Sequence, residues 1–276
     1  MRHRRFFVSQ AACACIIKES LMPVTAVSGS ASGIGAAVCA QLRAAGHRII
    51  GIDRGNAEVV ADLSTRAGRQ AAVAQVLEQC GGVLDGLVCC AGIGVTAPSS
   101  GIVLAVNYFG VSELLDGLAD ALAKGENPAA LVIGSVAATH SGAEQEPMVA
   151  AMLAGDEAKA LELANALGQT HLAYAGSKYA VTCAARRKAV QWAPQGIRLN
   201  VVAPGAVETP LHQAAKDDAR FGKAVREFVA PLGRSGTPEE LARVVAFVQS
   251  AQASFMTGSV VFVDGGMDAM VRTQRF

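Results

Sequence analysis

The segment Tyr174–Lys178 reads Tyr-Ala-Gly-Ser-Lys and places a phenol and an amine four positions apart. Residues i and i+4 share one face of a helix, so we expect the Lys178 ammonium beside the Tyr174 hydroxyl. A free tyrosine has a pKa of about 10, and a nearby cation lowers it by favouring the phenolate. Lowering it by roughly three units takes about 4 kcal/mol, and we expect Lys178 to contribute to this. Such a tyrosine exchanges a proton with an alcohol or carbonyl oxygen, although the spacing alone also occurs on surface helices.

Two further polar residues join this pair as candidates for catalysis. Ser135 ends the apolar run that starts at Ala129, so it is expected at the carboxyl end of a strand, where open α/β sheets bind ligands. Its hydroxyl is suited to donate to a developing oxyanion, although a serine in this place also simply begins a loop. Asn107 stands in the apolar context Val-Asn-Tyr-Phe and is either part of the site or a buried packing residue.

A glycine-rich turn joins the β-branched run Val24–Ser28 to a predicted helix over residues 36–45. Glycines there allow a tight turn and let backbone N–H groups and the helix N-terminus approach a pyrophosphate. The other interpretation is a turn that only closes the strand onto its helix. The candidate cofactor-binding residues of this turn are Gly29, Ser30, Ala31, Ser32, Gly33, Ile34 and Gly35.

An acidic residue marks the end of the second predicted strand. Asp53 lies 24 residues after Gly29, where a carboxylate accepts hydrogen bonds from the adenosine ribose of a dinucleotide. The same charge repels a 2′-phosphate, so the sequence predicts NAD as the cofactor. Arg54 follows and offers the alternative of NADP, but the glycine turn carries no basic residue.

Strands and helices alternate along the rest of the chain. A parallel sheet with right-handed crossovers and helices on both faces follows from this order, which is an α/β, Rossmann-type doubly wound fold in a single domain. The predicted strands are 24–28, 47–53, 59–61, 86–90, 129–135, 198–202 and 259–264. The predicted helices are 36–45, 66–79, 102–124, 174–193 and 238–250.

Composition excludes several classes of function. The formal net charge is +1 and basic residues are scattered, so we predict no nucleic-acid partner. No run of about 18 uncharged apolar residues occurs, so we predict no membrane partner and a cytoplasmic location. Seven cysteines without a C-x-x-C pair are read as reduced thiols, and we expect no metal. Residues 1–21 fit a signal peptide poorly and are interpreted as a disordered extension or a mis-assigned start, which leaves 22–276 as the catalytic domain.

The glycine spacing G-x-x-x-G-x-G, with Ser135 and the Tyr174/Lys178 pair, resembles the short-chain dehydrogenase/reductase family. The resemblance implies that Tyr174 and Lys178 also contact the cofactor and that Asn107 holds a water linked to the lysine. It further implies cofactor contacts for four residues: Asp62, Leu63, Gly92 and Thr209. The family's usual Asn-Ala-Gly is replaced here by Cys90-Ala-Gly, which removes an amide that normally steadies the sheet.

Two spacings depart from the family pattern. Ser135 and Tyr174 are 39 positions apart, so residues of about 140–170 are predicted to form a helical insertion. Only 15 positions separate Gly92 from Asn107. Within the family these features resemble the bacterial 3α-hydroxysteroid dehydrogenase/carbonyl reductases. That resemblance implies NAD(H), small apolar carbonyl or alcohol substrates including 3α-hydroxysteroids and 3-ketosteroids, and a homodimer.

Two alternatives remain open from the sequence. A reductase of 3-ketoacyl thioesters uses the same catalytic residues but selects NADP and lacks the long insertion. A non-catalytic module that senses dinucleotide would share the fold, because fold alone does not prove chemistry.

Overall fold

A computed structural model describes residues 22–140 and 142–274, and the interpretation of residues 1–21 falls outside this range. The described residues contain a parallel sheet of seven strands in the order β3-β2-β1-β4-β5-β6-β7. The predicted α/β doubly wound fold is therefore confirmed. The strands are β1 (Val24–Ser28), β2 (Arg48–Asp53), β3 (Val59–Val60), β4 (Gly86–Cys89), β5 (Ala129–Ile133), β6 (Arg198–Pro204) and β7 (Val260–Val263).

The central strands are apolar because both of their faces are covered. Every residue of β4 and β5 is buried, whereas all four residues of the edge strand β7 are only half-buried. The strand order reverses between β1 and β4, since β1 pairs with β2 on one side and with β4 on the other. In sheets of this type, ligands bind at the carboxyl ends of the strands where the order reverses.

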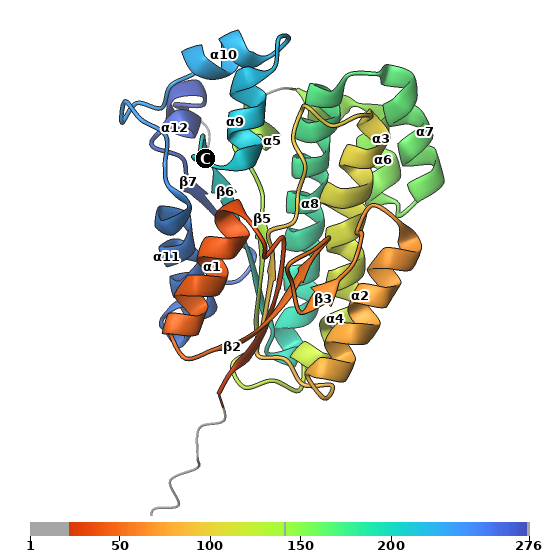
Figure 1. Cartoon of the computed structure of the whole chain (residues 1–276), viewed down its shortest axis with the longest axis vertical. Helices are drawn as coiled ribbons and strands as arrows, with labels where there is room; N and C mark the ends of the chain where they lie inside the picture. The colour runs from red at the N-terminus through yellow and green to blue at the C-terminus, as the bar shows by residue number, and fades with distance from the viewer. Residues whose placement is uncertain (1–21, 141, 275–276) are drawn as a thin grey trace, which may run out of the picture.

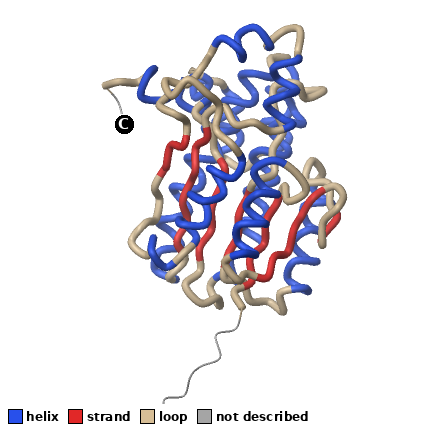
Figure 2. Tube along the Cα trace, turned by 60° about the vertical axis from the view of Figure 1, so that its left-hand side comes forward, coloured by secondary structure: helices blue, strands red, loops and turns tan. Residues whose placement is uncertain are grey.

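Helices cover the sheet on two sides (Figures 1 and 2). On one side α1 (Gly33–Ala44) packs against α11 (Pro238–Gln249). On the other side lie α2 (Arg66–Gln79), α4 (Val111–Leu122) and α8 (Thr170–Trp192), and Trp192 is buried in the apolar core of this side. Each side has its own apolar core.

The segment predicted as one long helix over residues 102–124 is interrupted. It begins as α3 (Ser100–Leu104), widens into a π-helical turn at Ala105–Gly110, and continues as α4. The stretch Ser100–Leu122 is long and apolar enough to span a membrane, but 61% of its most apolar window is buried inside the protein. We therefore interpret it as a core helix.

Helices fill the segment of about 140–170 between β5 and the catalytic helix. After α5 (Ala137–His140) come α6 (Pro147–Leu153) and α7 (Glu157–Leu167), and α7 packs on α3 and on the π turn. Gly155 has the left-handed φ of 76°, and the Asp156 side chain caps α7 by accepting from Lys159 N. Helix α8 begins at Thr170, four residues earlier than predicted.

Three short helices lie above the carboxyl edge of the sheet (Figure 1). They are α9 (Pro210–Asp217), α10 (Gly222–Glu227) and α12 (Met267–Val271). Asp264 stabilises the start of the last of them by accepting hydrogen bonds from the N–H groups of Gly266 and Asp268.

Candidate active site

A cavity of about 460 Å³ opens at the carboxyl edge of the sheet. Its walls come from the segments that follow β1, β2, β3, β4, β5 and β6, from the middle of α8 and from α9. Tyr174, Lys178, Ser135 and the glycine turn, which are far apart in the sequence, all line it. Most of the predicted catalytic and cofactor-binding residues therefore share one pocket, and the exceptions are Ser30, Ala31 and Asn107.

The glycine turn presents the N-terminus of α1 to this cavity. Ser32, Gly33, Ile34 and Gly35 line it, and Ser32 makes no side-chain cap, so the first turn of α1 faces the cavity without a capping side chain. Glycine is required at position 35 because a Cβ there would stand 1.9 Å from the Gly29 carbonyl oxygen. A helix N-terminus with bare amides is suited to bind a pyrophosphate.

Two residues of the turn are not brought to the cavity. The Ser30 side chain lies instead beside β2, since its Oγ is 2.6 Å from the position that a Gly51 Cβ would occupy. Ala31 donates its backbone N–H to Asp53 Oδ2 at 3.0 Å and does not line the cavity. Their predicted contacts with cofactor are not supported by this placement.

The acidic residues predicted for the adenosine half lie at the far end of the cavity. Asp53 lines this end, and its carboxylate is held by the N–H groups of Ala31 and Arg54. Asp62 is exposed, and its hydrogen bonds with Ser64 hold the pKa of its carboxyl below the usual value. Leu63 is buried at 6% exposure and lines the same wall.

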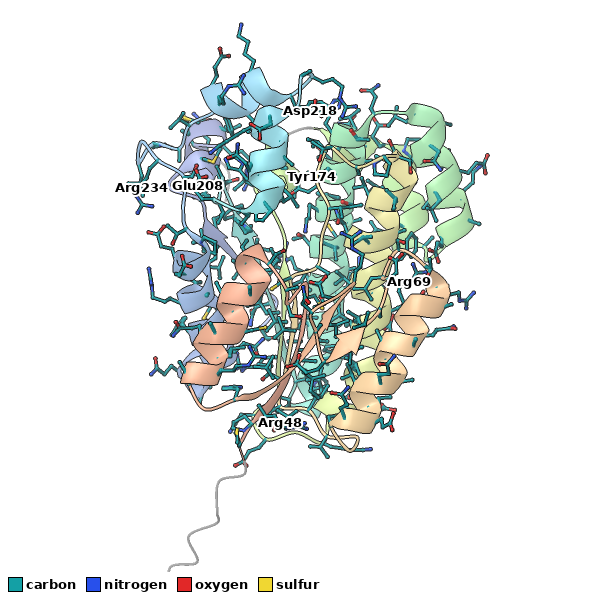
Figure 3. All side chains as sticks on the ribbon, in the orientation of Figure 1. Arg48, Arg69, Tyr174, Glu208, Asp218 and Arg234 are labelled. Carbon is teal, nitrogen blue, oxygen red and sulfur yellow. The ribbon has the colours of Figure 1, made fainter. Side chains whose placement is uncertain are left out.

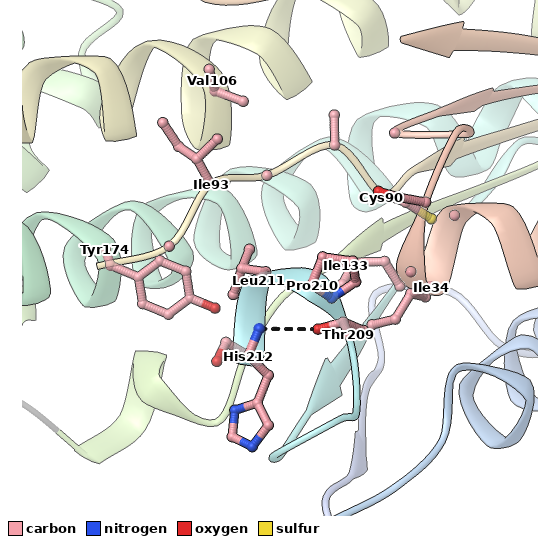
Figure 4. Close-up of a pocket in the computed structure, with 18 of the residues that line it drawn as sticks. Ile34, Cys90, Ile93, Val106, Ile133, Tyr174, Thr209, Pro210, Leu211 and His212 are labelled. Atoms are coloured by element: carbon pink, nitrogen blue, oxygen red, sulfur yellow. Dashed lines mark hydrogen bonds between the residues drawn. The ribbon is translucent and has the colours of Figure 1, made fainter. Parts of the chain in front are cut away.

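Ser135 and Tyr174 converge at the other end. The Ser135 hydroxyl lies beside the Tyr174 phenol and acts on its pKa, and Ser135 Oγ accepts from Ala137 N at 3.1 Å. The Tyr174 hydroxyl points toward the start of α9 (Figure 4). Burial raises the pKa of Tyr174, and the neighbouring Ser135 hydroxyl opposes this rise. Burial thus sets the direction of the Tyr174 pKa, and the lowering expected from Lys178 stays a prediction.

Lys178 is 5% exposed and donates from Nζ to the Ile133 carbonyl oxygen at 2.8 Å. Burial lowers the pKa of Lys178 from its usual 10.5 to about 8, an effect that the nearby Cys90 and Cys89 oppose. A Cβ at position 92 would lie 3.6 Å from this amine, which is ordinary contact, and 3.3 Å from Asn107 Oδ1, which is tighter.

Asn107 lies in the π turn and is fully buried. Its Oδ1 accepts from Ile93 N at 2.9 Å, and its Nδ2 donates to the Ile93 carbonyl at 3.0 Å and to Ser177 Oγ at 3.2 Å. The amide thus fixes the loop after β4 to α8. A π turn often occurs at functional sites because the wider turn redirects side chains. Its predicted role in holding a water remains a prediction.

Cys90, which stands where the family has asparagine, also lines the cavity. Burial raises the pKa of Cys90 well above 9, so it remains a neutral thiol at physiological pH. The cysteines of the described residues form no disulfide, in agreement with the predicted reduced thiols. They are Cys39, Cys80, Cys89, Cys90 and Cys183. Within the described ranges, no group of three His, Cys, Asp or Glu side chains could hold a metal.

Thr209 begins α9 and caps it by accepting from His212 N at 3.2 Å (Figure 4). Its Cγ2 is 3.3 Å from the position of a Gly33 Cβ, so α9 starts directly against the glycine turn. Sequence reasoning missed the residues of this region that line the cavity, because nothing in their pattern distinguishes them from a solvated helix. They are Leu211, His212, Ala215 and Val225, and from other segments Ile93, Val95 and Val106.

Comparison with known families agrees with the geometry. A family model described as short chain dehydrogenase matches residues 23–170, more than half of the chain. The chain belongs to the short-chain dehydrogenase family. A second model, described as enoyl-(acyl carrier protein) reductase, matches residues 160–268.

Several relatives within the short-chain dehydrogenases resemble the chain over nearly its whole length. The 3-alpha-hydroxysteroid dehydrogenase/carbonyl reductase of Comamonas testosteroni is 49% identical and covers 92% of this chain and 100% of its own. The galactitol 2-dehydrogenase (L-tagatose-forming) of Cereibacter sphaeroides is 29% identical, with coverages of 96% and 98%. The crystal structure of the 3-alpha-hydroxysteroid dehydrogenase from Pseudomonas sp. B-0831 complexed with NADH is 67% identical, with a TM-score of 0.91 and coverages of 92% and 100%.

Proposed function

We propose that the protein is an NAD(H)-dependent oxidoreductase that interconverts secondary alcohols and ketones. The expected substrates are 3α-hydroxysteroids, 3-ketosteroids and other apolar carbonyl compounds. The observation that carries the proposal is that Ser135, Tyr174 and the buried Lys178 line the same cavity as the glycine turn. The likeness to the steroid dehydrogenases of Comamonas testosteroni and Pseudomonas supports the substrate class.

The cavity fits a dinucleotide. The α1 N-terminus offers amides for the pyrophosphate, and Asp53 lies at the end of β2 where ribose hydroxyls are bound in such sheets. The Asp53 carboxylate favours NAD because it repels a 2′-phosphate. At the opposite end, Thr209 and the loop around Gly92 enclose the region beside Tyr174, where a nicotinamide would be held.

The catalytic groups are arranged for proton transfer to and from a carbonyl oxygen. The bound nicotinamide supplies or accepts the hydride. Ser135 and Tyr174 together are placed to hydrogen-bond the substrate oxygen, which orients the carbonyl and stabilises the charge that develops on it. Because burial raises the Tyr174 pKa, the phenol is protonated at neutral pH and is ready to donate its proton during reduction. Lys178 stabilises the resulting phenolate when it is protonated.

The substrate end of the cavity is apolar. Its walls carry Ile93, Val95, Val106, Leu211 and Val225. Such a surface binds a hydrophobic body by removing apolar area from water, at about 25 cal/mol per Å². A bulky steroid or aromatic ketone fits this wall better than a sugar does.

The deciding experiment follows NADH absorbance with androsterone, 5α-dihydrotestosterone and simple aromatic ketones. We expect turnover by the native protein and a loss of about 10²–10⁴-fold in kcat for Tyr174→Phe, because the proton donor is removed. NADH binding, measured by fluorescence, should remain. Absence of turnover by a native protein that binds NADH would favour the sensing module. A preference for NADPH and 3-ketoacyl thioesters would favour the thioester reductase.

We also propose a cytoplasmic homodimer formed through the edge of the sheet. The half-buried strand β7 lies there, and Phe247 and Phe255 of the neighbouring segments are exposed. A two-fold interface that pairs this surface with itself would cover these apolar groups. Helix α7 covers α3 and the π turn, which makes that other surface unavailable for pairing. We expect sedimentation at twice the monomer mass, and Phe247→Glu to yield monomers.

A further inference from the structure

Arg69 lies in α2 with a side chain that is fully shielded from solvent (Figure 3). Its Nε is 3.0 Å from Glu113 Oε1 of α4, and its Nη2 is 2.7 Å from Glu157 Oε2 of α7. Burial alone would lower the pKa of Arg69, but the two carboxylates reverse this and raise it. Three helices therefore meet at one buried cation, and one of them, α7, belongs to the insertion.

The guanidinium also contacts the wall of the cavity. Arg69 Nη1 donates to the Leu63 carbonyl oxygen at 3.3 Å. The Leu63 side chain is confined from the other side, since its Cβ is 3.3 Å from the position of a Gly110 Cβ in the π turn. Leu63 is thus held between the π turn and Arg69.

The position of Leu63 in the cavity decides what it would contact. The glycine turn after β1 faces a pyrophosphate, and Asp53 at the end of β2 faces the adjoining ribose. Leu63 follows β3, the next strand outward, and lines the same cavity. The base attached to that ribose must lie against this outermost wall.

Helix α7 of the insertion, which carries Glu157, is fixed at both ends. Glu157 is the first residue of α7, next to the Asp156 cap. Toward the other end of the helix, Asn165 Oδ1 accepts from Gly101 N at 2.8 Å and fixes α7 to α3. A helix anchored in two places keeps the Glu157 carboxylate in a constant place for Arg69.

We propose that Glu157 and Arg69 are positioning residues for the adenine end of the dinucleotide site, and that the insertion thereby sets cofactor affinity. The inference rests on the proposed dinucleotide function. Neither side chain touches the cofactor. They act by fixing the Leu63 carbonyl, and with it the wall against which the base stacks. The competing view is that the ion pairs only join helices.

The test compares Glu157→Gln with Glu162→Gln in the full-length protein. Glu162 lies on the same helix but pairs with Lys159 at the exposed surface, so it is a matched control. Calorimetry measures the Kd for ADP, which carries the adenosine and the pyrophosphate without the nicotinamide. Steady-state kinetics measures kcat and the KM values for NAD and androsterone, and thermal melting measures Tm.

We expect the Kd for ADP and the KM for NAD to rise about threefold to tenfold in Glu157→Gln, the range for residues that act on a ligand indirectly. The kcat at saturating NAD and the KM for androsterone should stay within about twofold, and Glu162→Gln should match the native protein. A lower Tm with an unchanged Kd for ADP would overturn the inference and leave a purely structural role. If Glu157→Gln does not fold, Glu157→Asp, which keeps the charge but shortens its reach, is judged by the same criterion. Failure of the native protein to bind ADP or NAD would instead refute the proposed function.

Discussion

Burial of the Lys178 ammonium lowers the stability of the folded protein in a way that pH can measure. The pKa of Lys178 is about 8 in the folded chain and 10.5 when exposed. Between these values the unfolded chain binds more protons than the folded one, so stability rises with pH. For these two pKa values, linkage gives a penalty of about 3 kcal/mol at pH 7, most of which disappears by pH 10.

Lys178→Met removes the charge while keeping a long, flexible side chain. We expect the unfolding free energy of the native protein to rise by about 2–3 kcal/mol relative to Lys178→Met between pH 7 and pH 10. Urea titrations at equal protein concentration measure it, and other titrating groups cancel in the difference between the two proteins. The absolute gain of the variant at pH 7 is smaller, because the Ile133 carbonyl loses its partner at about 1–3 kcal/mol. A difference that is flat with pH, or that falls as pH rises, would refute the assignment of a desolvated lysine.

Three other variants test separate parts of the site. Ser135→Ala should lower kcat by about 10²–10³-fold with little change in NADH affinity, since it removes one donor to the reacting oxygen. Stopped-flow reduction assays measure the rate, and an unchanged kcat would contradict the prediction. Asp53→Asn should raise the ratio of kcat/KM for NADP over NAD by about tenfold, because one repulsive charge near the 2′-phosphate is lost; an unchanged ratio would exclude Asp53 as the selector. Gly35→Ala should lower Tm and abolish NADH binding, because the new Cβ would stand 1.9 Å from the Gly29 carbonyl oxygen. The control Gly55→Ala has open space around the new Cβ, so its unfolding free energy should change by no more than about 0.5 kcal/mol. Retention of NADH binding by Gly35→Ala would show that the turn adapts.

Much of the fold follows from local pattern. The helix over residues 66–79 has the predicted bounds, and the predicted strands lie where apolar runs end in glycine or polar residues. The spacing of apolar residues predicts these helices and strands because their buried positions are apolar. The π turn at Ala105–Gly110 was not predictable, since its residues have the same apolar pattern as a regular helix and the i to i+5 bonding depends on packing against α8 and the loop after β4.

The site was predicted in outline but not in its electrostatics. The sequence placed Tyr174, Lys178 and Ser135 in a common site because their types and spacing suit carbonyl chemistry, and the structure brings them together. Spacing on a helix shows which residues share a face, but it does not show which partner takes the lysine amine. That partner is the Ile133 carbonyl, 45 positions away along the chain. The rise of the Tyr174 pKa depends on burial, and the segments around the tyrosine come from other parts of the chain. Long-range packing decides both.

The structural features that are unfavourable for stability lie around the cavity. A buried lysine, a π turn and a glycine beside the lysine amine each lower stability relative to an ordinary residue or turn, and Lys178, Asn107 and Gly92 lie within one connected group of contacts. The Asn107 amide holds the backbone at Ile93, that loop carries Gly92, and Gly92 leaves room beside the Lys178 amine. A side chain at position 92 would therefore contact both the Asn107 amide and the Lys178 amine. These contacts explain why the buried lysine, the π turn and Gly92 occur together at the catalytic end. The regular elements α1, α2 and α11 form the remainder of the framework.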